Sequence, residues 1–382
     1  MFNTQRLISD RLLAIDASGI RKVFDLAAKI KDPINLSIGQ PDFDVPQPIQ
    51  QSAIDAINAG HNRYTQTQGI AELRDAVMKK FRHQFAHDGR WQPSGATSLI
   101  TAGVSGGLFL AILTCVGPGD EVLIGDPYFV MYKHLVTLAG GRAKFIDTYP
   151  DFQLTPARVE PHITDRTKLL ILGSPSNPTG VVTPPEVLKQ LARLCEQRGI
   201  LLVSDEIYDE FCYAKVKGRS PSPASFSDNL LVLRGFSKTY GMTGWRLGYA
   251  VGPSPLIEQM TKLQQYTFVC APSMVQDAGV AALAVDMSDH VAAYQRKRDR
   301  VVAMLKDRFE LTVPEGAFYA FPKVPTGETA TRFVERAISK KLLIIPGNVF
   351  SERDTHFRIS YACEDATLER GLTLLNELAE KR

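Results

Sequence analysis

The sequence is poor in cysteine and tryptophan, with five and two residues respectively among 382. The cysteines are scattered, odd in number and never arranged as a C-x-x-C pair, which argues against zinc binding or dithiol chemistry. Such usage is typical of a reduced, cytosolic protein. The five are Cys115, Cys195, Cys212, Cys270 and Cys363. We therefore expect no metal centre.

Long apolar runs are also missing. No stretch reaches the roughly 18 consecutive apolar residues that would span a bilayer. The first 16 residues, MFNTQRLISDRLLAID, interrupt their apolar positions with charges and lack the continuous apolar core of a signal peptide. We expect a cytoplasmic protein without a membrane partner.

Charge of one sign is not in excess either. Lysine and arginine number 44 against 41 aspartates and glutamates, which leaves a net charge of +3 that no basic block concentrates. This balance argues against nucleic acid as a main partner. The hydrophobic fraction of 44% and the length are those of a globular protein with room for a large core and two domains.

Short apolar runs alternate with longer amphipathic stretches from about residue 94 to 252. The runs include SLITAG, DEVLIGDP, TKLLILGSP, ILLVSDEIY, NLLVLRGFSK and RLGYAVG. This alternation favours parallel strands buried on both faces, and hence an α/β protein. The C-terminal third instead mixes helical stretches with the short strands of GAFYAFPKV, LLIIPGNVF and HFRISYA, which predicts a smaller α+β domain.

Polar and glycine-rich segments follow the apolar runs of the predicted sheet. In such sheets a ligand binds just beyond the carboxyl ends of the strands. The segments are residues 103–107, 126–129, 174–180, 205–208 and 237–246. We expect them to converge on one crevice.

Lys238 follows one of these runs directly. Its context, GFSKT, lacks the glycine before the lysine and the earlier glycine that a phosphate-binding P-loop requires. A lysine that acts as a nucleophile needs a pKa below the usual value of about 10.4, which burial and nearby positive charge provide. Arg246, eight residues further on, can supply that charge or clamp an anion with two hydrogen bonds.

Asp205 in SDEIY follows another run and belongs to the same predicted crevice. A lone acid at such a place often caps the next helix. An unpaired buried carboxylate needs a cation, however, and a protonated heteroaromatic nitrogen would serve. Nearby, Asn177 in SPSNPTG precedes Pro178, which keeps it out of helical conformation, and its amide can donate to an oxygen.

The stretch TAGVSGGLF joins a strand to a helix and can bind an anion. Its glycines let a ligand approach the backbone N–H groups at the positive end of the helix, whereas the G-x-G-x-x-G pattern of dinucleotide sites is missing. Ser237 and Arg246 are expected to face the same place. One ligand uses a phosphate, a pyridine nitrogen, a phenolic oxygen and an aldehyde together, and that ligand is pyridoxal 5′-phosphate (PLP).

Taken together, these motifs resemble the class I/II aminotransferases of fold type I nearly from end to end. The likeness rests on GQPDF at Gly39–Phe43, RYTQTQGIAELR at Arg63–Arg74, SPSNPTG, SDEIY, SKTYGMTGWRLGY and FRISYA at Phe357–Ala362. The resemblance implies an α/β fold of three layers around a mostly parallel seven-stranded sheet. It also implies a large PLP-binding domain at residues 46–282 and a smaller domain from residues 1–45 and 283–382.

The resemblance further implies the roles of the cofactor-binding residues. Lys238, Asp205 and Tyr208 would be catalytic: Lys238 would form the aldimine with PLP and move the proton, and Asp205 would keep the ring nitrogen protonated. Asn177 and Tyr208 would hydrogen-bond the phenolic oxygen. Phe129 would stack on the ring, and a core phenylalanine is the alternative at this position. The phosphate would be held by Gly103, Val104, Ser105, Ser237 and Arg246.

Substrate binding and assembly are implied in the same way. Arg358 in FRIS would bind the substrate α-carboxylate through two hydrogen bonds, with Gly39 and Asn177 beside it. Tyr64 would reach the phosphate in a neighbouring subunit, so we expect a homodimer with shared active sites. The reaction would move an amino group between an L-amino acid and a 2-oxo acid with ping-pong kinetics.

Two departures from the common pattern leave the cofactor prediction standing. Gln40 replaces a frequent glutamate, and Val104 lies within the phosphate loop, but neither removes a donor that only a side chain provides. No residue is an obvious partner for a second substrate carboxylate, which argues against aspartate specificity. Aspartate-, alanine- and aromatic-type donors all stay open. A PLP-dependent C–S lyase or other carbanion enzyme is the alternative, and a non-catalytic regulator is a remote one.

Overall fold

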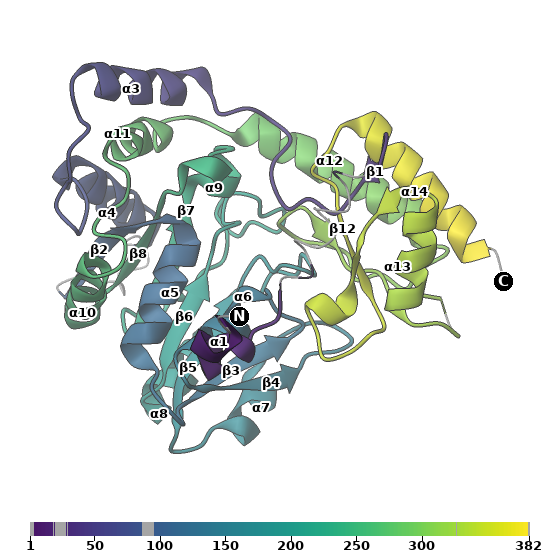
Figure 1. Cartoon of the computed structure of the whole chain (residues 1–382), viewed down its shortest axis with the longest axis horizontal. Helices are drawn as coiled ribbons and strands as arrows, with labels where there is room; N and C mark the ends of the chain where they lie inside the picture. The colour runs from purple at the N-terminus through teal and green to yellow at the C-terminus, as the bar shows by residue number, and fades with distance from the viewer. Residues whose placement is uncertain are drawn as a thin grey trace.

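The computed structural model describes residues 4–17, 19, 28, 30–85, 95–325 and 327–380. A seven-stranded sheet with the order β2-β8-β7-β6-β5-β3-β4 forms its centre (Figure 1). All neighbours from β7 to β4 are parallel, and β8 runs antiparallel to both β7 and β2. The strands are β2 (Ala96–Thr101), β3 (Glu121–Asp126), β4 (Arg142–Asp147), β5 (Thr167–Gly173), β6 (Leu201–Asp205), β7 (Leu230–Gly235) and β8 (Gly248–Pro253). The predicted mostly parallel seven-stranded sheet is confirmed.

Apolar side chains cover both faces of this sheet. Successive residues of a strand point to opposite faces, so Leu170 and Leu172 of β5 join the core on one face while Leu169 and Ile171 join the core on the other. A strand buried on both faces must be apolar throughout. This requirement explains the continuous apolar runs of the sequence.

Helices form a layer on each face. The core on one face includes residues of α3 (Gln47–Asn58), α4 (Ala71–Phe85), α7 (Pro156–Val159), α8 (Pro185–Arg198) and α11 (Ser273–Ala282). The core on the other face includes residues of α5 (Gly103–Cys115), α6 (Met131–Leu138) and α10 (Ser254–Gln265). The sheet is therefore the middle of three layers. No helix of the described residues is long and apolar enough to cross a membrane.

A second group of elements comes from the two ends of the chain (Figure 1). Two short sheets pair β1 (Ile34–Asn35) with β10 (Leu342–Leu343), and β12 (Phe357–Ser360) with both β11 (Ile345–Pro346) and β9 (Tyr319–Ala320). Around them lie α12 (Ser288–Leu305), α13 (Ala330–Ser339) and α14 (Asp365–Glu380), which share a core of their own. The domain boundaries at residues 46 and 283 stay a prediction.

Short helices complete the chain. The N-terminal pair is η1 (Thr4–Leu7) and α1 (Asp10–Leu13), of which α1 lies near α6 in Figure 1. The others are η3 (Glu160–His162), η4 (Pro223–Ser225), α9 (Phe236–Thr239), η5 (Thr243–Trp245) and η6 (Gly347–Val349). Among these, α9 and η5 follow β7 directly, so they carry the lysine segment past the carboxyl end of the sheet.

Candidate active site

All but two of the predicted site residues line one cleft of about 580 Å³. They are Gly39, Val104, Ser105, Phe129, Asn177, Asp205, Tyr208, Ser237, Lys238, Arg246 and Arg358. The cleft lies where β5, β6 and β7 end, because Gly173, Asp205 and Ser237 all belong to its wall. It also takes in Tyr319 and Arg358 from β9 and β12. The convergence of strand ends on one crevice is thus observed.

Lys238 reaches into this cleft from the short helix α9. Its Nζ donates a hydrogen bond to the carbonyl oxygen of Gly39 over 2.7 Å. Burial and the positive charges of Arg358 and Arg246, opposed by the charge of Asp205, together lower the pKa of Lys238 to about 8. A neutral amine is therefore accessible near physiological pH, which a lysine nucleophile requires.

Asp205 ends β6 and is buried. Its Oδ2 accepts a hydrogen bond from the Tyr132 hydroxyl over 2.8 Å, and its Oδ1 accepts one from the backbone N–H of Ile207 over 3.3 Å. Burial raises the pKa of Asp205 to about 6 against these hydrogen bonds. Within the described residues no lysine, arginine or histidine forms a salt bridge with it. A protonated pyridine nitrogen would supply the missing positive partner.

A network on the far side of the strand fixes the position of Asp205. The next residue, Glu206, accepts hydrogen bonds from Nε and Nη2 of Arg234 at 2.9 and 2.7 Å. Its other oxygen accepts from the hydroxyls of Ser204 and Ser222 at 2.9 and 2.6 Å. Because Glu206 and Arg234 are buried and satisfied, this network holds the end of β6 in one geometry.

The loop between β2 and α5 forms an anion cradle. Gly103 has a φ of +72°, and a Cβ added there would lie 2.6 Å from Nη2 of Arg246, so only glycine fits. The first turn of α5 has no side-chain cap, which leaves its N–H groups for a ligand. Arg246 is steadied by a 2.9 Å hydrogen bond from Nη1 to the carbonyl oxygen of Thr243, and its Nη2 lies 3.5 Å from Oγ of Ser105. Gly103 thus shapes the cradle from behind.

Arg358 on β12 is 1% exposed and has no carboxylate partner among the described residues. Its Nη1 donates to Oδ1 of Asn177 over 3.0 Å, and its Nη2 donates to the carbonyl oxygen of Ser37 over 2.8 Å. Its Nε is buried without a hydrogen-bond partner in the described part of the chain. A buried guanidinium with spare donors at the edge of a cleft suits a substrate carboxylate.

The N-terminal segment reaches the site by joining the C-terminal strands. The backbone N–H of Leu36 donates to the carbonyl oxygen of Leu343, and the N–H of Ser360 donates to the carbonyl oxygen of Leu36. These bonds place the following residues, Ser37 to Gly39, between Arg358 and Lys238. The strand pairing of β1 with β10 is therefore what brings Gly39 into the cleft.

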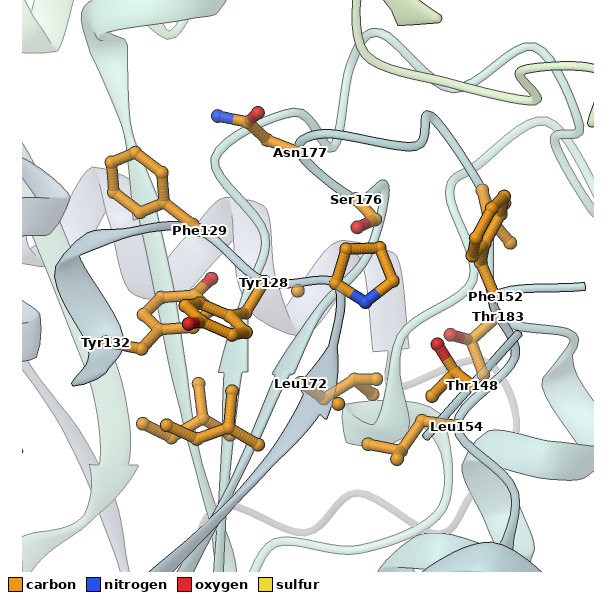
Figure 2. Close-up of a pocket in the computed structure, with 16 residues that line it drawn as sticks. Tyr128, Phe129, Tyr132, Thr148, Phe152, Leu154, Leu172, Ser176, Asn177 and Thr183 are labelled. Carbon is orange, nitrogen blue, oxygen red and sulfur yellow. The ribbon is translucent and has the colours of Figure 1, made fainter. Parts of the chain in front are cut away.

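Phe129 and Asn177 border both this cleft and a smaller neighbouring cavity of about 40 Å³. Figure 2 shows Phe129, Tyr132 and Asn177 on one side of the small cavity, with Phe152 and Leu154 on the other. The Phe129 ring meets the Tyr132 ring edge to face, with ring centroids 5.7 Å apart. Phe129 is partly exposed toward the cleft, which leaves its ring available for a ligand.

Two predicted residues do not line the cleft. Gly103 lies behind the phosphate cradle, in contact range of Arg246. Tyr64 is 85% exposed and lies outside the cleft of this single chain. Its expected place in a second subunit stays a prediction.

Two tyrosines that were not predicted from the sequence also line the cleft. Tyr132 donates to Asp205, and the hydroxyl of Tyr319 lies 2.9 Å from that of Tyr208. Tyr132 lies three residues after Phe129, about one helical turn away, which is a signal that could have found it. Tyr319 lies in a two-residue strand without any local chemical signature.

The donors and acceptors of the cleft match PLP group by group. The aldehyde would meet Lys238, whose pKa is lowered, and the ring nitrogen would meet Asp205, a buried carboxylate without a cation. The phosphate would meet the N-terminus of α5 and Arg246, and the phenolic oxygen would meet Asn177 and Tyr208. No group of at least three possible metal ligands occurs among the described residues. The residues present therefore fit this cofactor.

Comparison with known proteins agrees with the geometry. Residues 31–375 match the family model "Aminotransferase class I and II". The chain is 38% identical to the probable aspartate aminotransferase of Methanocaldococcus jannaschii, over 98% of this chain and 100% of that protein. It is 35% identical to aromatic-amino-acid aminotransferase 2 of Thermococcus litoralis, over 98% and 99%.

Solved structures give the same result. The aspartate aminotransferase of Thermus thermophilus with maleate superimposes with a TM-score of 0.90 at 33% identity, over 97% of this chain and 99% of that one. The aspartate aminotransferase of Thermotoga maritima gives 0.89 at 32% identity, with the same coverage. The chain therefore belongs to the class I and II aminotransferases, and it is a pyridoxal-phosphate-dependent transferase.

Proposed function

We propose that the cleft carries the transfer of an amino group between an L-amino acid and a 2-oxo acid, with Lys238, Asp205 and Tyr208 as catalytic residues. These roles are supported by one observation: a single cleft contains Lys238, whose pKa is lowered, together with the buried carboxylate of Asp205 and the buried guanidinium of Arg358, neither of which has an ion-pair partner in the described residues. PLP, when bound, supplies an aldehyde for the amino group and a ring that accepts electrons from the substrate Cα.

Each residue has a task that its position supports. Lys238 holds the cofactor and then moves the proton at Cα, because its pKa of about 8 lets it give and take a proton near neutral pH. Asp205 keeps positive charge on the ring nitrogen. Asn177 accepts a hydrogen bond from Arg358 at its Oδ1, which leaves its amide N–H₂ free to donate; together with Tyr208 it would bind the phenolic oxygen.

The remaining residues bind and orient the ligands. Arg358 would donate two hydrogen bonds to the substrate α-carboxylate, with Gly39 beside it. Phe129 packs on the ring. The phosphate would be held by Val104, Ser105, Ser237 and Arg246, through the N-terminus of α5 and one guanidinium, with Gly103 completing the loop behind them.

Trapping one half of the reaction tests the proposed function. Mixed with a suitable amino acid in the absence of any 2-oxo acid, the PLP-loaded enzyme is expected to lose its visible absorption and accumulate the amine form of the cofactor. Adding 2-oxoglutarate, pyruvate or oxaloacetate should restore the visible absorption. A C–S lyase would release product without accumulating the amine form, and that outcome would overturn the assignment.

The donor is to be chosen among aspartate, alanine and aromatic amino acids. The lysine and arginines that line the described cleft are Lys238, Arg246 and Arg358. Each is already assigned to the cofactor or to the substrate α-carboxylate. Val104, Leu108, Val130 and Met131 add apolar surface to the wall. Screening these three donors against the three oxo acids measures which pair gives the highest kcat/KM.

We infer that the enzyme is a homodimer with shared active sites. Tyr64 and Tyr266 are 85% and 84% exposed, and Phe268 is 40% exposed. Their two segments lie side by side, since Nε2 of Gln264 donates to the carbonyl oxygen of Thr67 over 2.6 Å. Exposed aromatic residues on neighbouring segments indicate a protein–protein contact surface, and in the proposed dimer a second copy of the chain packs against it.

Sedimentation at micromolar concentration is expected to give the mass of a dimer. In addition, Tyr64→Phe should weaken PLP binding roughly tenfold, which is the typical effect of losing one hydrogen bond to a charged group. The matched control is Tyr361→Phe, which removes a buried hydroxyl outside the cleft and should leave PLP binding unchanged. A monomer with full activity would contradict the shared site.

A cytoplasmic location is the final part of the proposal. All five cysteines are free. Unpaired thiols are typical of proteins in a reducing compartment. Cell fractionation that recovers the enzyme outside the cytoplasm would contradict it.

A further inference from the structure

Tyr319 touches three parts of the proposed site at once. It lies on β9, where it pairs with Ser360 of β12, and it is 1% exposed. Its hydroxyl lies 2.9 Å from the hydroxyl of Tyr208. A Cβ added to Gly39 would lie only 2.6 Å from the same hydroxyl, so the phenol packs against the N-terminal segment as well.

The Tyr319 ring also orients the guanidinium of Arg358. The guanidinium carbon lies 4.5 Å from the centroid of the Tyr319 ring and 4.6 Å from that of the Phe350 ring. A guanidinium that contacts two aromatic faces gains cation–π attraction and keeps its plane fixed. Tyr319 therefore helps to set the direction in which Arg358 presents its donors.

The direction of the hydrogen bond between the two tyrosines follows from what each can donate. Tyr208 has one hydroxyl proton and, beside a bound cofactor, two possible acceptors: the Tyr319 oxygen and the phenolic oxygen of PLP. A charged oxygen is the stronger acceptor. With PLP bound, Tyr208 would donate to the cofactor, and its own oxygen would accept the proton of Tyr319. Donation into a hydroxyl strengthens that hydroxyl as a donor.

We propose that Tyr319 is a positioning residue that acts on both ends of the ligand. Its hydroxyl strengthens the hydrogen bond from Tyr208 to the cofactor oxygen, and its ring holds Arg358 for the substrate carboxylate. This inference rests on the proposed roles of Tyr208 and Arg358.

Spectrophotometric pH titration of the PLP-loaded enzyme tests the role of the hydroxyl. Tyr319→Phe is expected to raise the apparent pKa of the cofactor absorption by about 0.5 unit, and Tyr208→Phe by about 1 to 2 units. A weaker hydrogen bond leaves more negative charge on the phenolic oxygen, which holds the nearby proton more tightly. The double variant should match Tyr208→Phe alone, because Tyr319 acts through Tyr208.

Binding of propionate, a carboxylate without an amino group, tests the role of the ring. Tyr319→Phe keeps an aromatic face and should change the Kd of propionate less than twofold. Tyr319→Leu removes that face and should raise the Kd about threefold to fivefold, as expected for the loss of one cation–π contact. Tyr361→Phe, a hydroxyl deletion outside the cleft, should change neither the titration nor the Kd.

The outcomes separate this inference from the proposed function. A wild-type protein that shows no visible absorption with PLP overturns both. If the wild type binds PLP and transaminates while the Tyr319→Phe titration superimposes on it, only the hydroxyl's role is refuted. A further pKa rise in the double variant would show that Tyr319 does not act through Tyr208, and an unchanged propionate Kd in Tyr319→Leu would refute the role of the ring.

Discussion

Lys238→Ala is expected to lower the transaminase kcat by about 10⁴-fold or more, because one substitution removes both the amine that would hold the cofactor and the base that would later move the proton. Lys238 is the lysine of the described cleft, and a water molecule in its place has no comparable basicity. The visible absorption that PLP gives with wild-type protein should vanish as well. Steady-state kinetics and an absorption spectrum of the purified variant measure the two effects.

A surface lysine provides the control for this experiment. Lys189→Ala removes an equal charge from the exposed side of α8, where Lys189 pairs weakly with Glu186 at 3.7 Å. Both activity and absorption should stay at the wild-type level, since such surface pairs contribute little. If Lys238→Ala retained more than about a tenth of wild-type kcat, another group would have to be the base.

The second large effect is expected for Asp205→Asn, which should reduce kcat about 10³-fold while the visible absorption persists. The amide has the shape of the carboxylate, but only its oxygen can accept, so it keeps one of the two hydrogen bonds that Tyr132 and Ile207 donate here. It cannot hold a positive charge on the ring nitrogen, and the electrons released at Cα then lose their sink. Lys238 is untouched and still binds PLP.

Two comparison variants sharpen this prediction. Tyr132→Phe keeps the Asp205 charge and removes one hydrogen bond, so its effect on kcat should be nearer tenfold. Asp165→Asn removes a carboxylate from the exposed surface and should have no effect. Full activity in Asp205→Asn, with PLP shown to be bound, would mean that the ring nitrogen is not held by this residue.

The cleft is formed both by the strand ends of the large sheet and by the short C-terminal strands. Lys238, Asp205 and the phosphate cradle come from the ends of sheet strands, whereas Arg358 and Tyr319 come from β12 and β9. In the proposed function, the strand ends of the large sheet would therefore bind the cofactor, and the short C-terminal strands would bind the substrate carboxylate. This division would let Arg358 bind a substrate beside a cofactor that other elements hold.

The sequence by itself determined the sheet and the cofactor side of the cleft. Strands buried on both faces must be apolar throughout, and residues that directly follow parallel strands share one edge, so Lys238 and Asp205 could be placed together from local pattern alone. Arg358 was located through the family motif FRIS, since nothing in its local pattern distinguishes it from a core position.

The tertiary structure alone decided which side chains touch. Tyr132 meets Asp205 across 73 residues, Tyr319 meets Tyr208 across 111, and Lys238 meets Gly39 across 199. The first contact depends on how α6 packs on the sheet, and the other two depend on how β1 and β9 pack near the strand ends of that sheet. No helical or strand periodicity encodes that packing. A hydrogen bond is set by the final positions of two atoms, which only the folded chain fixes.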